Sequence, residues 1–170
     1  MTSVLMRWNE LRAGEAAEEV LPCCGSKGWA QAMAARRPFP NEAALLATSD
    51  EVWTSLSESD WMEAFGSHPR IGESHAPASS SARSAAWSGE EQRRAGTANE
   101  DVKSALAEAN RAYEQRFHRI FIVCANAKSA PEILEILRRR LQNDDTTELH
   151  EAAEQQRQIA RLRLKKWLNS

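Results

Sequence analysis

The sequence lacks several features that would place a chain of 170 residues outside the cell or in a membrane. Its three cysteines are an odd and small number, which suits a reducing compartment better than a disulfide framework. No run approaches the ~18 consecutive apolar residues that a membrane-spanning helix needs, and no apolar N-terminal run precedes a cleavage-like site. We therefore expect a cytoplasmic protein that has no membrane partner.

The sequence also lacks an excess of basic charge. Its 22 Lys and Arg residues are outnumbered by 24 Asp and Glu residues, which gives a formal net charge of −2. A nucleic-acid-binding domain usually carries a basic excess, so no nucleic-acid partner is expected. There is no glycine-rich phosphate loop, zinc-like cysteine pairing or cofactor fingerprint either. We expect chemistry carried by side chains, without a metal or a cofactor.

What the sequence does contain is helical periodicity along most of its length. Apolar residues recur three and four positions apart between breaks at glycine and proline. Asn41 and Asn99 are expected helix caps, and the last helix is expected to start at Thr146 or Thr147. The pattern predicts an all-α protein, with residues 1–170 forming a single-domain bundle of roughly eight or more helices.

Two segments depart from this pattern. Residues 121–125 are an apolar run too short for a helix, and we expect them to form a short, buried, extended segment with free backbone groups. Residues 76–86 are rich in Ser and Ala and lack large apolar side chains, so we expect a mobile surface loop. This loop could be a plain linker or a lid, and composition leaves both open.

A constrained turn at residues 67–73 carries a reactive group. Pro69 pushes His68 out of the α region, and Gly72 permits a backbone path that few other residues allow. Arg70 could brace this corner through a carboxylate. The turn could be a simple helix stop, or it could hold the imidazole in place for proton transfer.

The spacing Ser88-x-x-Glu91-Gln92 is typical of a capping box, in which the serine begins a helix and the glutamate reaches back to it. A capping box is usually structural. A helix N-terminus also presents free N–H groups that can hold an anion, so a binding role stays open.

One arginine of the last helix is predicted to point inward. On a helical wheel Arg163 falls on one face, whereas Arg161 lies on the polar side with Arg157 and Lys165. The other residues of the inward face are Leu149, Ala152, Ala153, Gln156, Ile159, Ala160, Leu164 and Trp167. A buried guanidinium needs an anionic partner, either a structural carboxylate or a carboxylate ligand.

Two other classes of function compete with a cofactor-free enzyme. His68, Glu73 and His75 could form the metal site of a hydrolase, although their spacing matches no common zinc motif. Six tryptophans could instead form the surface of a helical interaction module.

Four motifs follow one another along the chain. They are Ser67-His68-Pro69-Arg70-Ile71-Gly72-Glu73, Ser88-x-x-Glu91-Gln92, Phe121-Ile122-Val123-Cys124-Ala125 and Leu162-Arg163-Leu164. In residues and order they resemble the 2-oxo-4-hydroxy-4-carboxy-5-ureidoimidazoline (OHCU) decarboxylase family. The resemblance covers nearly the whole chain, and its His-Pro-Arg-Ile-Gly motif is far more specific than a helix cap.

The resemblance implies an all-helical homodimer, a carboxy-lyase that converts the small molecule OHCU to (S)-allantoin in urate breakdown without a cofactor. It implies that His68 is the catalytic acid or base and that Glu91 is its catalytic partner. The implied substrate-binding residues are Pro69, Ser88, Gln92, Phe121, Ile122, Val123, Cys124, Ala125 and Arg163.

Overall fold

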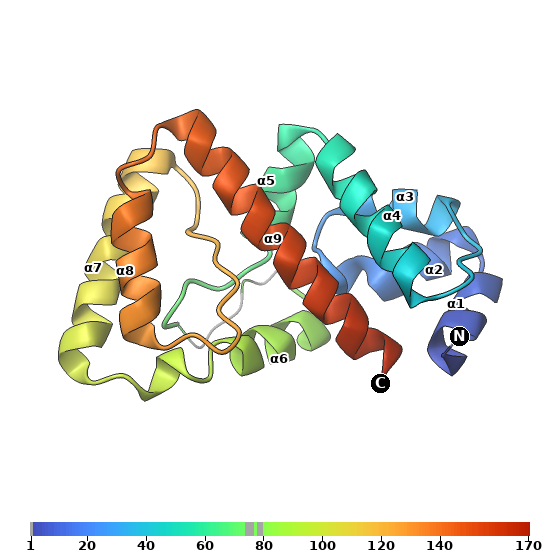
Figure 1. Cartoon of the computed structure of the whole chain (residues 1–170), viewed down its shortest axis with the longest axis horizontal. Coiled ribbons are helices and arrows are strands. Elements are labelled where there is room, and N and C mark those ends of the chain that lie inside the picture. Colours follow the sequence, from blue (N-terminus) through green and yellow to red (C-terminus); the bar gives the residue numbers. More distant parts are fainter. Residues whose placement is uncertain (1, 74–76, 78–79) are drawn as a thin grey trace. The chain divides into compact units, whose positions relative to one another are not determined.

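The computed structural model describes residues 2–73, 77 and 80–170, and its regular structure is helical (Figure 1). Within these residues there are nine α-helices, two short 3-10 helices and no strand, which confirms the predicted all-α class. The elements are α1 (Ser3–Glu10), α2 (Ala13–Val20), η1 (Leu21–Cys23), α3 (Lys27–Ala35), α4 (Glu42–Ser55), α5 (Glu58–Gly66), α6 (Ala82–Glu91), η2 (Ala95–Thr97), α7 (Glu100–Phe117), α8 (Ala130–Arg140) and α9 (Asp145–Leu168).

The chain forms two compact units. The first comprises Met1–Ala64 and Arg157–Ser170, so it holds α1 to α4, most of α5 and the C-terminal half of α9. The second comprises Phe65–Gln156, with α6, α7, α8 and the first half of α9.

Aromatic side chains build the core of the first unit. Trp8 is fully buried, meets Trp167 edge to face at a centroid distance of 5.4 Å, and stacks on Phe39 at 5.9 Å. Its indole N–H donates to the carbonyl of Ala16 at 2.9 Å, which satisfies the one polar atom of the ring. Trp29 and Trp53 are also buried. Four of the six tryptophans therefore serve the core, which weighs against the interaction module.

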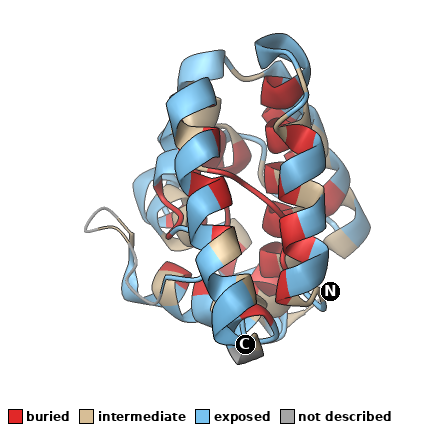
Figure 2. Ribbon diagram, turned by 90° about the vertical axis from the view of Figure 1, so that its left-hand side faces the viewer, coloured by how far each residue is buried: buried red, intermediate tan, exposed pale blue. Residues whose placement is uncertain are grey.

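The predicted inward face of α9 is confirmed. Every residue that the wheel placed inward is buried, including Leu149, Ala152, Ala153, Gln156, Ile159, Ala160, Arg163, Leu164 and Trp167. Figure 2 shows how buried and exposed positions alternate along the helices, as amphipathic helices require. Arg157 and Arg161, on the other side of α9, both pair with Asp50, at 3.1 and 2.6 Å.

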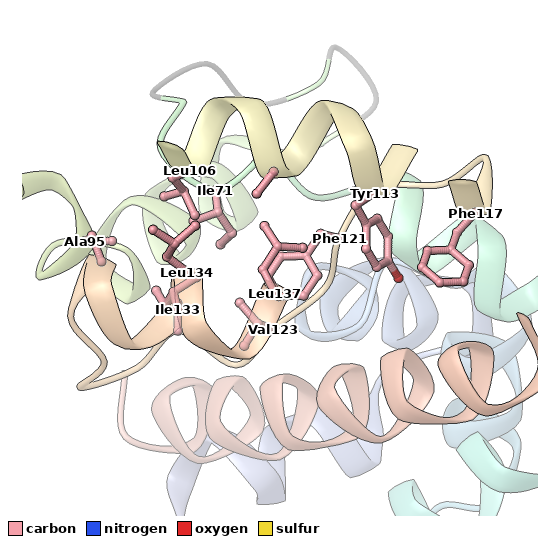
Figure 3. Close-up of a cluster of buried hydrophobic side chains, with 13 residues drawn as sticks. Ile71, Ala95, Leu106, Tyr113, Phe117, Phe121, Val123, Ile133, Leu134 and Leu137 are labelled. Carbon is pink, nitrogen blue, oxygen red and sulfur yellow. The ribbon is translucent and has the colours of Figure 1, made fainter. Parts of the chain in front are cut away.

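The second unit is organised around α7 and α8, which lie side by side (Figure 1). Asn99 caps α7 as predicted, since its Oδ1 accepts the N–H of Val102 at 2.9 Å. Between the two helices Tyr113 contacts the rings of Phe117 and Phe121, at centroid distances of 4.8 and 5.2 Å (Figure 3). Ile133, Leu134 and Leu137 of α8 complete this cluster.

The segment of residues 121–125 is buried throughout and is not helical, as predicted. Its side chains divide between two directions. Phe121, Val123 and Ala125 belong to the hydrophobic cluster of the second unit, whereas Ile122 and Cys124 do not. This alternation is the one expected of extended chain.

Two helix starts differ from the prediction. The loop expected at residues 76–86 is helical from Ala82, because Ser81 caps α6 by accepting the N–H of Ser84 at 3.1 Å. The capping box expected at Ser88 is therefore wrong, since Ser88 lies inside α6. At α9 the cap is Asp144, which accepts the N–H of Thr147 at 2.8 Å. Residues 76, 78 and 79 of the predicted loop lie outside the described residues.

No helix in the described residues is both long enough and apolar enough to cross a bilayer.

Candidate active site

The turn at residues 67–73 forms a buried corner after α5. His68 follows the end of the helix, and its N–H donates to the carbonyl of Phe65 at 3.2 Å. Its side chain is 6% exposed. Gly72 has φ of +88°, a conformation that residues with a Cβ rarely adopt. Gly72 thus takes the backbone path that the sequence predicted for this corner.

Three groups hold this corner in the second unit. The carbonyl of Ile71 accepts from the side-chain amide of Asn110 at 3.1 Å, and the side chain of Ile71 packs in the hydrophobic cluster. Arg70 is half exposed and forms a two-point ion pair with Glu114 of α7, at 2.5 and 3.1 Å. Arg70 thus braces the turn through a carboxylate, as expected.

The His68 imidazole meets a side chain that sequence reasoning did not assign to the site. Its Nε2 lies 2.7 Å from Oε1 of Gln156, a residue of α9 that is completely buried. The sequence carried one signal for this contact, because the helical wheel already placed Gln156 among apolar residues. A buried amide on an apolar face needs a partner, as a buried guanidinium does.

A cavity of about 250 Å³ lies beside the turn. Three predicted substrate-binding residues line it, namely Pro69, Ser88 and Gln92. Glu73 and Arg93 also line it, and neither was predicted to bind substrate. The volume is close to the ~300 Å³ at which small-molecule sites begin, so the cavity suits a compact ligand.

The end of α6 brings its motif residues to this cavity. Ser88 is 3% exposed, and Gln92 follows it one helical turn later, so both face the same side. The Oε1 of Gln92 accepts the N–H of Gly72 at 3.0 Å, which ties the helix end to the His68 turn. Glu91 is the last residue of α6 and is half-buried.

This placement changes the electrostatics expected at the Ser88 motif. The motif lies at the C-terminal end of a helix, where the dipole is negative and repels an anion. The idea that a helix N-terminus holds the anionic substrate there is therefore wrong. A positive charge on the cavity has to come from a side chain, and Arg93 is such a cation.

The segment of residues 121–125 uses several of its backbone groups internally. The carbonyl of Ile122 accepts from Arg140 Nη1 at 2.6 Å, and the N–H of Cys124 donates to Gln155 Oε1 at 2.9 Å. Lys128 donates to the carbonyls of Cys124 and Ala125, at 2.7 and 3.0 Å. The expectation that all backbone groups of this segment are free was therefore wrong for these four.

Hydrogen bonds connect the three motif stretches of the second unit. Gln92 joins the end of α6 to the His68 turn, and Arg94 donates to the carbonyl of Ala127, just after the 121–125 segment. Gln155 and Gln156 join that segment and the His68 turn to α9. The structure thus brings together motifs that lie far apart in the sequence.

Arg163 belongs to the first unit, unlike the other predicted site residues. It is completely buried, as predicted, and its Nη1 donates to the carbonyl of Pro22 at 3.2 Å. The guanidinium therefore has a main-chain acceptor in its own unit.

The charge of Arg163 also acts on a neighbouring thiol. Burial raises the pKa of the Cys24 thiol to about 12, although the backbone of Ser26 and the charge of Arg163 act to lower it.

The alternative metal site involves a residue that is not described. His75 lies outside the described residues, so the structure does not test whether His68, Glu73 and His75 lie close together. Among the residues that are described, no group of three His, Cys, Asp or Glu side chains is placed to hold a metal ion.

Comparisons with known proteins agree on one family. The model of the OHCU decarboxylase family matches residues 9–165. The uric acid degradation bifunctional protein TTL of Arabidopsis thaliana is 33% identical over 144 residues, which are 85% of this chain and 44% of the relative. The uric acid degradation bifunctional protein of Bacillus sp. (strain TB-90) is 26% identical over 163 residues, 94% of this chain and 31% of the relative. The chain thus spans less than half the length of these curated relatives.

Two solved structures are similar to this chain in fold. A crystal structure of OHCU decarboxylase in the presence of (S)-allantoin has a TM-score of 0.78 and 31% identity, covering 90% of this chain and 99% of the other. A crystal structure of (S)-allantoin synthase has a TM-score of 0.70, covering 96% of this chain and 53% of the other. At 17% identity this second similarity concerns the fold alone.

Proposed function

Because the chain belongs to the OHCU decarboxylase family, we propose that it decarboxylates OHCU to (S)-allantoin in the breakdown of urate, without a cofactor. One structural observation carries the proposal. Pro69, Ser88 and Gln92, taken from two separate motifs, line one small cavity beside the buried His68 turn. The urate-degrading relatives in Arabidopsis thaliana and Bacillus support the same pathway.

The reaction needs a place for the electrons that carbon dioxide leaves behind. Cleavage of the bond to the carboxylate leaves an electron pair on the ring carbon that also carries the hydroxyl. The adjacent ring C=N can accept this pair, so the substrate is its own electron sink. The enzyme then has to orient the carboxylate, remove the hydroxyl proton and add one proton to a single face of the ring.

His68 is the proposed proton acceptor for the hydroxyl group, and Glu91 is its proposed catalytic partner. An imidazole suits this task because it exchanges protons near neutral pH. The buried imidazole has a short contact with Gln156, and such contacts favour a fixed approach to the substrate. Glu91 directly precedes Gln92, whose amide oxygen binds the His68 turn.

Substrate binding is assigned to the cavity and to the 121–125 segment. Ser88 and Gln92 can hydrogen-bond the ureido and ring groups, and Arg93 supplies a positive charge for the carboxylate. For Phe121, Ile122, Val123 and Ala125, we restrict the proposed contacts to backbone groups that the internal hydrogen bonds do not use. Cys124, whose N–H and carbonyl both have internal partners, is proposed as a substrate ligand on the family motif alone. Arg163 is proposed as a substrate ligand on the family motif alone.

We also propose that residues 1–170 act as one OHCU decarboxylase-like domain, and as a homodimer in the cytoplasm. The family model spans residues of both compact units, which supports one functional domain. Cys23, Cys24 and Cys124 are buried thiols, which fits a reducing compartment. The homodimer rests on the family resemblance.

The proposal is tested by adding the purified protein to freshly generated OHCU. Loss of OHCU should be faster than its spontaneous decay, in proportion to the protein concentration. A rate equal to that of spontaneous decay would rule the activity out.

A further inference from the structure

We propose that two consecutive glutamines of α9, Gln155 and Gln156, are positioning residues of the decarboxylation site. Gln156 holds the His68 imidazole, and Gln155 holds the 121–125 segment through the amide of Cys124. This inference rests on the proposed function, and it adds residues that none of the four motifs contains.

The contact between Gln156 and His68 is short and shielded from water. The two atoms lie 2.7 Å apart, and the exposed fractions are 6% for His68 and 0% for Gln156. A buried amide loses its bonds to water, which costs free energy unless protein partners replace them. Packing alone would favour an apolar residue at this position, so the amide indicates a task for its polar atoms.

Gln155 makes the matching contact on the neighbouring side of the helix. Its Oε1 accepts the N–H of Cys124 at 2.9 Å. Consecutive helical residues point about 100° apart, so adjacent side chains can reach two different segments from one turn. Because both glutamines lie in one continuous helix, they relate the position of the imidazole to that of the backbone of Cys124.

The Gln156 contact also determines which ring nitrogen of His68 carries hydrogen. An amide oxygen accepts a hydrogen bond, so in the neutral ring the hydrogen belongs on Nε2. Nδ1 is then the basic nitrogen that takes up a proton. Under the proposed role of His68, Nδ1 is then the ring atom that would receive the hydroxyl proton.

The two glutamines should affect different kinetic constants. Gln156 acts through the group that transfers protons, so its loss should lower kcat. Gln155 acts through a segment assigned to substrate binding, so its loss should raise KM. A merely structural role would change stability and leave both constants close to those of the wild type.

The tautomer is tested directly by ¹⁵N NMR of the histidine rings. The His68 signals among the four histidines are identified by their absence in His68→Gln. At a pH where the ring is neutral, the wild type should show His68 protonated on Nε2, and Gln156→Met should show a mixture of tautomers. A wild-type ring protonated on Nδ1, or an unchanged tautomer in Gln156→Met, would overturn the assignment.

Kinetics with fresh OHCU provide the second readout. Gln156→Met should lower kcat roughly tenfold to a hundredfold. This is less than the ~10²–10⁴-fold that general acid–base catalysis contributes, because the variant keeps the imidazole and loses only its positioning. Gln155→Met should raise KM severalfold, and Gln115→Met, on the exposed face of α7, serves as the matched control with wild-type constants. Circular dichroism verifies that the variants are folded, and Gln156→Asn, whose shorter side chain withdraws the amide oxygen from the imidazole, replaces Gln156→Met if that variant is unfolded.

The proposed function and the role of the two glutamines can be overturned separately. A wild-type protein without decarboxylase activity overturns the proposed function. An active wild type whose kcat and KM are unchanged in both glutamine variants overturns this inference alone.

Discussion

Arg140 and Glu148 form an ion pair with no exposed surface. Arg140 Nη2 lies 2.5 Å from Glu148 Oε1, and both side chains are 0% exposed. Glu148 also accepts from Tyr113 at 2.5 Å, while Arg140 donates to the carbonyl of Ile122 at 2.6 Å. The pair therefore connects α7, α8 and α9 to the 121–125 segment that is assigned to substrate binding.

Glu148→Gln should destabilise the protein strongly. The substitution leaves the Arg140 guanidinium buried without a carboxylate, and the loss of one partner of a buried pair typically costs about 3–5 kcal/mol. Urea denaturation measures the change in the free energy of unfolding. The control is Glu51→Gln, which removes the exposed pair with Arg36 and should cost less than about 1 kcal/mol. Equal losses in the two variants would contradict this reading of the buried pair.

The three cysteines should resist thiol reagents in the folded protein. Burial raises the pKa of Cys24 to about 12, and Cys23 and Cys124 are buried as well. At pH 8 very little of Cys24 would then be in the reactive thiolate form. Ellman's reagent should react slowly with the native protein and quickly with three thiols after denaturation. Rapid modification of Cys24 in the native state would contradict its burial in the folded protein.

Glu151 should make stability depend on pH in the acid range. A hydrogen bond from Arg139 lowers the pKa of this carboxyl below its ordinary value of 4.5. The ionised form is favoured in the folded state, so its contribution is complete above about pH 4.5 and is lost as pH falls through the lowered pKa. Glu151→Gln should therefore be less stable than wild type near neutral pH, and the difference should shrink in acid. Urea denaturation across pH measures this, with Glu135→Gln on the exposed face of α8 as control. A difference that stays constant with pH would refute it.

The two arginines of α9 should differ in their effect on substrate binding. Arg163→Met removes the buried guanidinium and should raise KM roughly tenfold or more, as expected for a charge-assisted hydrogen bond. Arg161→Met removes a partner of Asp50 on the other side of the helix and should leave KM unchanged. If the two variants had the same KM, Arg163 would have no special part in binding.

Local patterns predicted much of the fold, because they depend on residues that are close in sequence. The inward face of α9 followed from helical spacing, and Asn99 was recognisable as a cap from its small polar side chain. The start of α6 was missed because Ser88-x-x-Glu91 fits a helix start and a helix interior equally well. The caps at Ser81 and Asp144 decided where these helices begin.

The site was predictable as a set of motifs but not as an arrangement. Pro69, Ser88 and Gln92 were named from sequence, yet the structure was needed to show that they line one cavity, where Gln92 is hydrogen-bonded to Gly72, 20 positions away. Gln156 lies 88 positions from His68, and no local pattern connects them. Such contacts are decided by packing between elements, which hydrophobic periodicity does not specify.

The central claim is tested most directly by the chirality of the product. In free solution a proton reaches either face of the ring, so spontaneous decay of OHCU gives racemic allantoin. With fresh OHCU, the wild-type protein should give an excess of (S)-allantoin by circular dichroism of the product, and His68→Ala should give the racemate while keeping its helical signal. Racemic allantoin from the wild-type protein, or an undiminished (S) excess from His68→Ala, would contradict the account.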